Sequence, residues 1–192
     1  NSALQTAIQY ADYLEAGYKN LVLFNYSDRL RSFGDWAVQL ISESLGKSDH
    51  APTPILARGV TDQHSSLQLF KMGPNDKFFM FIYPHQFQNH NLQITPLFQK
   101  PVDYLKAETF ARLHNFEMQG TIQSLVESQR PVVSISIEQF DEWQVSSLLL
   151  FFMYFTCFLS EILKYNCFDQ PGVELSKQIT KQLLINNKVY NA

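Results

Sequence analysis

"KFFMFIYP", residues 77–84, is a run in which almost every side chain is apolar. A strand with one face in water alternates apolar and polar residues, whereas this run is apolar on both faces. "NLVLFNYS" (residues 20–27) has the same character, and "PILARGV" (54–60) and "RPVVSISIEQ" (130–139) are further strand candidates, the last rich in β-branched residues. Strands of this kind predict a mainly parallel sheet that is covered by helices on both sides.

The stretches between these strands have helical patterns. Apolar residues recur at helical spacing in "LRSFGDWAVQLISESLGK" (residues 30–47), where Gly46 is a typical stop. Other helices are expected at residues 3–16, 64–72, 104–129, from about 145 to 166, and 171–186. The alternation predicts an α/β fold, a three-layer αβα sandwich with further helices at its C-terminal end. No repeat or linker divides residues 1–192, which we expect to form one domain.

Composition narrows the possible partners. The chain has 192 residues, 45% of them hydrophobic and 17% charged, with a formal net charge of −3. This weak acidic balance argues against nucleic acid or an anionic membrane surface as the main partner. Cys157 and Cys167 fit neither a disulfide framework nor a metal site, so we expect buried free thiols in a reducing compartment, the cytoplasm.

The run "VSSLLLFFMYFTCFL" (residues 145–159) is the most apolar part of the chain. It is shorter than the roughly 20 apolar residues that a membrane span needs. We therefore interpret it as a buried core helix, with a surface for a partner protein as the alternative. Exposure of its apolar face would favour the alternative.

Three polar stretches are candidates for a functional site, because ligands of parallel α/β folds collect beyond the strand ends or at neighbouring helix ends. In "ESLGK", Glu43 and Lys47 end a helix; either both are solvated, with Lys47 binding the last carbonyls, or Glu43 is a proton-transfer base. In "TDQHS", Asp62 is a candidate cap that would place His64 in the first helical turn, where the positive helix end favours a neutral imidazole.

The third stretch is "FDQPGVELSK", residues 168–177. Asp169 or Gln170 is a candidate cap, and Pro171 suits the first helical position. Glu174 and Lys177 lie one turn apart, so a surface ion pair would explain them without any function. Local structure alone leaves both interpretations open.

Taken together, these stretches resemble the glucose-6-phosphate isomerase (phosphoglucose isomerase) family, in its bacterial form. The C-terminal signature of that family runs here from Ser160 to Lys177 without a departure, including Asp169-Gln170, Gly172-Val173-Glu174 and the final lysine. "YSDRLRSFGDWAVQLISESLGK" and "GVTDQHSSLQLFKMGPND" resemble the family in the same order and spacing. The similarity covers essentially the whole chain and implies a flavodoxin-like sugar-isomerase (SIS) domain.

The resemblance implies a role for individual residues in interconverting glucose 6-phosphate and fructose 6-phosphate, a step of glycolysis and gluconeogenesis. Glu43 corresponds to the base that moves a proton between C2 and C1, and His64 and Lys177 to the groups that open and close the sugar ring. Gln39 and Gln170 correspond to glutamines that contact the substrate. The resemblance implies no cofactor and no metal, and a homodimer in which the histidine reaches the partner subunit's site.

Family members have a first SIS domain with a phosphate-binding loop and an active-site arginine, and neither motif is found here. The chain starts with Asn rather than Met, and we expect it to be the second domain of a two-domain isomerase and inactive, or nearly so, alone. The alternative is a non-catalytic SIS domain that binds sugar phosphates. None of the following arginines lies in the family's arginine motif: Arg29, Arg31, Arg58, Arg112 and Arg130.

Overall fold

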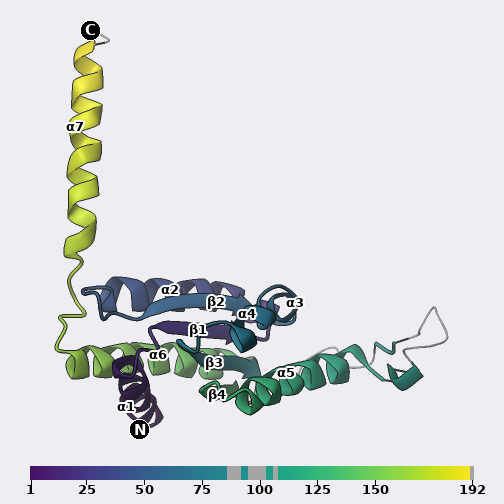
Figure 1. Cartoon of the computed structure of the whole chain (residues 1–192). Helices are drawn as coiled ribbons and strands as arrows, with labels where there is room; N and C mark the ends of the chain where they lie inside the picture. Colours follow the sequence, from purple (N-terminus) through teal and green to yellow (C-terminus); the bar gives the residue numbers. More distant parts are fainter. Residues whose placement is uncertain (86–91, 95–102, 106–107, 191–192) are drawn as a thin grey trace.

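The centre of the structure, a computed structural model, is a parallel sheet of four strands (Figure 1). The structure describes residues 1–85, 92–94, 103–105 and 108–190. The strands are β1 (Asn20–Asn25), β2 (Thr53–Arg58), β3 (Lys77–Pro84) and β4 (Val132–Ile137), in the order β2-β1-β3-β4. All three neighbouring pairs are parallel. The predicted strands and their parallel arrangement are confirmed.

The two central strands are buried on both faces, as their apolar runs predict. Leu21 and Leu23 of β1 point to one core, whereas Val22 and Phe24 point to the other, and β3 divides its side chains in the same way. Each core is closed by helices, so neither face of these strands meets water. This is the physical reason why polar residues are nearly absent from "KFFMFIYP".

Helices cover both faces of the sheet, which confirms the three-layer αβα sandwich. One core lies beneath α1 (Ser2–Glu15), α2 (Arg31–Leu45) and α6 (Glu142–Leu163). The other lies beneath α4 (Leu67–Met72) and α5 (Phe110–Glu127). The expected C-terminal helix α6 is therefore part of a layer of the sandwich rather than an addition to it.

Two helix predictions need correction. The helix expected at residues 64–72 is divided into α3 (Thr61–Ser65) and α4, because Ser66 has a backbone φ of −116°, outside the helical range. The helix expected from residue 104 begins at Phe110, where the Thr109 side chain caps it by accepting from the Arg112 N–H at 3.2 Å. Residues 103–105 form a separate 3₁₀ turn, and residues 106–107 lie outside the described residues.

The apolar helix α6 is buried on one side only. Leu148, Phe152, Phe155 and Leu159 follow a helical spacing and enter the core. In the described part of the chain, α6 is the one helix long and apolar enough to cross a membrane, and 33% of its apolar window is buried. Leu150, Met153 and Tyr154 are exposed on its other side. The prediction of a core helix is thus right for one face and wrong for the other.

The cysteines are free thiols, as expected, but both are half-buried rather than buried. Burial raises the pKa of the Cys157 thiol, and the neighbouring Cys167 thiol raises it further. The two thiols therefore lie close to each other, one on α6 and one in the segment that follows it.

The last helix, α7 (Glu174–Tyr190), extends away from the sandwich (Figure 1). It is preceded by a 3₁₀ turn, η3 (Pro171–Val173), which Pro171 begins as predicted. Its apolar residues are exposed: Leu175, Ile179, Leu183, Leu184 and Ile185.

Candidate functional site

Glu43 lies in the last turn of α2 and is held by a glutamine of its own helix. Gln39 stands one turn earlier on the same face, and its Nε2 donates to Glu43 Oε1 at 2.9 Å. The spacing of four residues allows this contact in any α-helix. The predicted neighbours Gln39 and Glu43 therefore do meet.

Gln170 reaches the same carboxylate from the other end of the chain. Its Nε2 donates to Glu43 Oε2 at 2.7 Å, across 127 residues of sequence. A cleft of about 460 Å³ opens at this point between the end of α2 and η3. Its lining consists of Ser42, Glu43, Gly46, Lys47, Gln170, Pro171, Gly172 and Val173.

This arrangement suits a carboxylate that transfers a proton. Each carboxylate oxygen has two lone pairs, and each accepts one amide hydrogen bond, so each keeps a lone pair for another partner. The two amides donate to different oxygens of the carboxylate and so fix the orientation of its plane. In the described ranges, no group of three or more His, Cys, Asp or Glu side chains is arranged to hold a metal ion.

Lys47 does not bind the last carbonyls of its own helix, contrary to the prediction. Its Nζ donates to the main-chain oxygens of Asn166 and Asp169 and to the Asp169 carboxylate, so it joins α2 to the segment after α6. The hydrogen bond from Lys47 holds the pKa of Asp169 below its ordinary value. Neither Asp169 nor Gln170 caps the following turn through its side chain, because both side chains point to α2.

His64 lies on α3, just beyond the carboxyl end of β2, and its side chain is exposed. Asp62 was predicted to cap this helix from the preceding position, but it lies within the helix. It accepts from the Arg58 N–H and the Ser65 hydroxyl. Because α3 has five residues, both of its ends are within about a turn of His64. The argument from a positive helix end therefore does not apply.

The residue before His64 is anchored in the sandwich. Gln63 Oε1 accepts a hydrogen bond from the Tyr26 hydroxyl at 2.8 Å and another from the Thr121 hydroxyl at 3.1 Å. Burial raises the pKa of Tyr26 to about 12, so this hydroxyl stays protonated and remains a donor. α3 is thus attached through Gln63 to the residue that follows β1 and to α5, while the His64 side chain is exposed.

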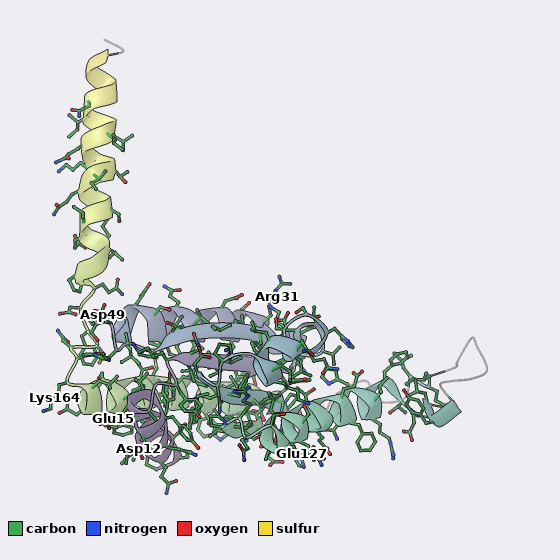
Figure 2. The ribbon with its side chains drawn as sticks, in the orientation of Figure 1. Asp12, Glu15, Arg31, Asp49, Glu127 and Lys164 are labelled. Carbon is green, nitrogen blue, oxygen red and sulfur yellow. The ribbon has the colours of Figure 1, made fainter. Side chains whose placement is uncertain are left out.

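Glu43 and His64 lie near opposite ends of strand β2, Glu43 on the side where the strand begins and His64 on the side where it ends. α2 ends next to the loop that enters β2, whereas α3 follows the end of β2, so the length of that strand, about 20 Å, separates them. Figure 2 shows this separation: Asp49, in the loop before β2, and Arg31, at the start of α2, are at opposite ends of the layer. His64 follows the end of a strand and Glu43 lies at a helix end, the two kinds of position where functional residues were expected.

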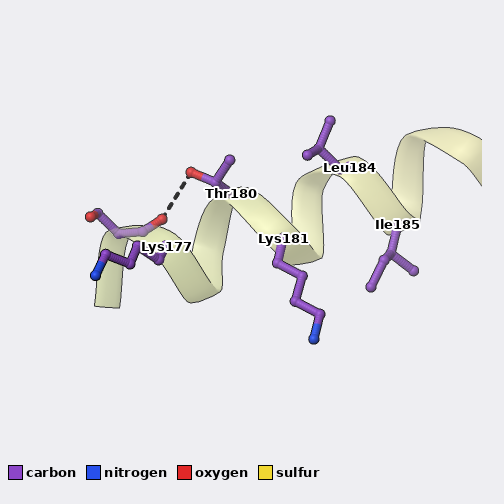
Figure 3. A pocket seen from close by; sticks show the side chains of 6 residues that line it. Lys177, Thr180, Lys181, Leu184 and Ile185 are labelled. Carbon is purple, nitrogen blue, oxygen red and sulfur yellow. Dashed lines mark hydrogen bonds between the residues drawn. The ribbon is translucent and has the colours of Figure 1, made fainter. Parts of the chain in front are cut away.

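Lys177 is not brought to Glu43 either. It forms the predicted ion pair with Glu174 at 2.7 Å on the surface of α7. A hollow of about 470 Å³ beside it is lined by residues of α7 alone (Figure 3): Ser176, Lys177, Thr180, Lys181, Leu184 and Ile185. A single helix provides no converging groups, so the structure unites Gln39, Glu43 and Gln170 and leaves His64 and Lys177 apart.

Comparison with known proteins shows which family the chain belongs to. The family model described as phosphoglucose isomerase matches residues 4–191. The chain belongs to the phosphoglucose isomerase family. Among curated relatives, the probable glucose-6-phosphate isomerase of Methanococcus maripaludis is 35% identical over 98% of this chain and 42% of its own length. The glucose-6-phosphate isomerase of Campylobacter jejuni is 35% identical over 94% of this chain and 45% of its own.

Two solved structures have a similar fold. A hypothetical protein from Thermus thermophilus superposes with a TM-score of 0.88 at 32% identity, over 95% of this chain and 45% of that one. A glucose-6-phosphate isomerase from Chlamydia trachomatis has the same fold, with a TM-score of 0.72 at 21% identity. The chain spans less than half the length of these relatives.

Three residues at these family motifs were not singled out for the roles that the structure gives them. Lys47 and Asp169 join the two parts of the cleft, and Gln63 anchors the helix that carries His64. Their only sequence signal is their position: Lys47 closes "ESLGK", Asp169 opens "DQPG", and Gln63 precedes the histidine of "TDQHS".

Proposed function

We propose that this chain is the C-terminal SIS domain of a glucose-6-phosphate isomerase, which interconverts glucose 6-phosphate and fructose 6-phosphate in the cytoplasm. The observation that carries the proposal is the carboxylate of Glu43, held on both oxygens by Gln39 and Gln170 at the edge of a cleft. Family membership over residues 4–191 supports the reaction class.

In the proposed reaction, Glu43 is the base of the open-chain sugar. It removes the proton from C2 of the aldose, which leaves an enediol(ate), and returns the proton to C1, while the proton of the C2 hydroxyl passes to O1, to give the ketose. The reverse sequence converts the ketose to the aldose. Because an adjacent carbonyl makes the C2 proton acidic, an ionised carboxylate at neutral pH is a sufficient base.

Gln39 and Gln170 have two proposed tasks. Their amides keep the Glu43 carboxylate in one orientation, which allows the same oxygen to reach C2 and C1 in turn. Both side chains are exposed, and Gln170 lines the cleft, so they are also available to the hydroxyl or phosphate oxygens of the sugar.

Ring opening needs a group that removes the hydroxyl proton and one that protonates the ring oxygen, and we assign His64 and Lys177 to these tasks. Since His64 and Glu43 lie near opposite ends of strand β2, one copy of the chain does not unite them. A second copy that presents its His64 to the cleft of the first would complete the site, and two-fold symmetry would then complete both sites at once. The proposed enzyme is therefore a homodimer.

The exposed apolar faces of two helices support the proposal that this chain works within a larger assembly. α6 exposes Leu150, Met153 and Tyr154, and α7 exposes an apolar row beside Lys177. Contiguous apolar surface of this kind marks protein contacts. The relatives are more than twice as long as this chain. We therefore propose that a first SIS domain supplies the phosphate-binding loop and the arginine, and that it covers part of the exposed apolar faces of α6 and α7.

A coupled assay tests the proposal on the full-length protein and on the 192-residue chain. We expect isomerase activity in the full-length protein and a loss of almost all of it in the chain alone. Robust activity of the chain alone would refute the shared site. Tight sugar-phosphate binding by the chain, together with an inactive full-length protein, would instead favour the non-catalytic binding domain.

A further inference from the structure

Lys47 crosses from the end of α2 to the segment between α6 and α7. Its Nζ donates to the Asn166 carbonyl at 2.7 Å, to the Asp169 carbonyl and to Asp169 Oδ1. An ammonium group has three N–H donors, and one segment of four residues, 166–169, accepts all of them. The Lys47 side chain is only 12% exposed, in contrast to the open carboxylate of Glu43 one turn earlier.

The segment that receives Lys47 is folded around its own polar groups. The other Asp169 oxygen accepts from Asn166 Nδ2 at 3.0 Å, and Asn166 Oδ1 accepts from the Phe168 N–H at 3.1 Å. The Tyr165 hydroxyl contacts the Ser48 hydroxyl beside Lys47. The turn at residues 165–169 is therefore attached to α2 at its base, directly before Gln170.

This attachment places Gln170 at the carboxylate. Gln170 follows Asp169 in the chain and donates to Glu43 Oε2, while Lys47 follows Glu43 by four residues. We propose that Lys47 is a positioning residue, which fixes the 165–169 turn so that Gln170 holds the Glu43 carboxylate. Its effect on catalysis rests on the proposed function, whereas its effect on the Gln170 contact does not.

Two simpler roles for Lys47 do not fit its surroundings. A solvated surface ion pair has an exposed ammonium group and contributes little, whereas this one is nearly covered and has two main-chain acceptors as well. A lysine that binds the sugar phosphate directly needs a free donor at the cleft, and the three donors of Lys47 are all used by the turn.

Nuclear magnetic resonance of the 192-residue chain tests the positioning without any assay. In the wild-type chain, the side-chain NH₂ signals of Gln39 and Gln170 both shift when acid protonates Glu43, because both donate to it. In Lys47→Met we expect the Gln170 shift to disappear and the Gln39 shift to remain. Lys47→Arg, which offers donors to the same acceptors, should restore part of it.

Lys19→Met is the matched control. Lys19 Nζ also donates to a main-chain oxygen, that of Asp49, at 2.8 Å. Asp49 lies in the same loop as Lys47, but the bond does not involve the 165–169 turn. Both glutamine shifts should persist in that variant. An unchanged Gln170 shift in Lys47→Met would overturn the proposal. If Lys47→Met abolishes the Gln39 shift too, because the chain unfolds, Asp169→Ala decides: a weakened Gln170 shift supports the proposal and an unchanged one overturns it.

Kinetics of the full-length protein give the second readout. Lys47→Met should lower kcat by about 10- to 100-fold and change KM little, since a displacement of about 1 Å in a catalytic group costs on this order. Gln170→Leu should lower kcat as well. The double variant should lose no more kcat than the more impaired of the two single variants. Additive losses would overturn the shared role, whereas an inactive wild-type protein would refute the proposed function and leave the resonance result standing.

Discussion

Gln170 donates a 2.7 Å hydrogen bond to Glu43 Oε2, although 127 residues separate the two in sequence. The contact joins the end of α2, in the first half of the chain, to the turn that precedes α7. It is the relationship on which the proposed site depends, because it converts a glutamate on a helix surface into an oriented carboxylate beside a cleft.

A first prediction concerns the packing of Gly59 against Tyr26. A Cβ at Gly59 would lie 2.4 Å from the Tyr26 ring, which is fully buried and cannot move aside without displacing its neighbours. Gly59→Ala should therefore destabilise the chain by about 1–3 kcal/mol in urea unfolding. The control is Gly120→Ala, in the interior of α5, where a Cβ meets nothing within 4 Å. It should stabilise the chain by roughly 0.5–1 kcal/mol, and equal effects of the two variants would contradict the packing argument.

The anchor of α3 gives a second prediction. Tyr26→Phe removes one of the two donors to Gln63 and keeps the ring, so it should cost about 1 kcal/mol of folding free energy. Amide hydrogen exchange at residues 61–65 should become faster than in the wild-type chain. Tyr154→Phe, at an exposed position of α6, removes a hydroxyl with no such role and should leave exchange in α3 unchanged. Unaltered exchange in Tyr26→Phe would show that the hydrogen bond from Tyr26 to Gln63 does not hold the helix.

A third prediction follows from the titration of His114 beside Tyr26. Burial holds the pKa of His114 below its ordinary value of 6.5, against the opposing effects of Glu117 and Asp28. As the pH falls through about 6.5, the unfolded chain therefore takes up a proton before the folded chain does, and folding stability decreases. The stability contributed by the neutral imidazole is complete above this pH.

Urea unfolding at pH 8 and at pH values below 6.5 measures this effect. His114→Phe keeps a ring against Tyr26 and cannot titrate, so it should lose less stability on acidification than the wild-type chain does. An identical loss in both would assign the pH dependence to other groups.

The fold was predictable from the sequence because its strands have a distinctive physical requirement. Runs such as "KFFMFIYP" are soluble only when both faces are covered, and that condition already specifies a parallel sheet between two helical layers. Predictions failed at helix boundaries that the apolar pattern does not encode. The Thr109 side chain starts α5 later than that pattern suggests, and the backbone at Ser66 divides the helix around His64.

The candidate site was only partly predictable. The pair of Gln39 and Glu43 follows from helical spacing, but the contact with Gln170 depends on how two distant segments pack. Lys47 illustrates the limit: a cation after a helix is as able to bind its own last carbonyls as those of another segment, and only the tertiary structure shows that it binds Asn166 and Asp169.

The central claim is that Glu43 is the base of an aldose–ketose isomerisation, and Glu43→Gln in the full-length protein tests it most directly. The substitution keeps the size and one acceptor oxygen of the side chain but removes the base. We predict that kcat falls by about 100- to 10,000-fold, the usual contribution of general base catalysis, while glucose 6-phosphate still binds with nearly wild-type affinity. Turnover close to that of the wild-type protein would contradict the account.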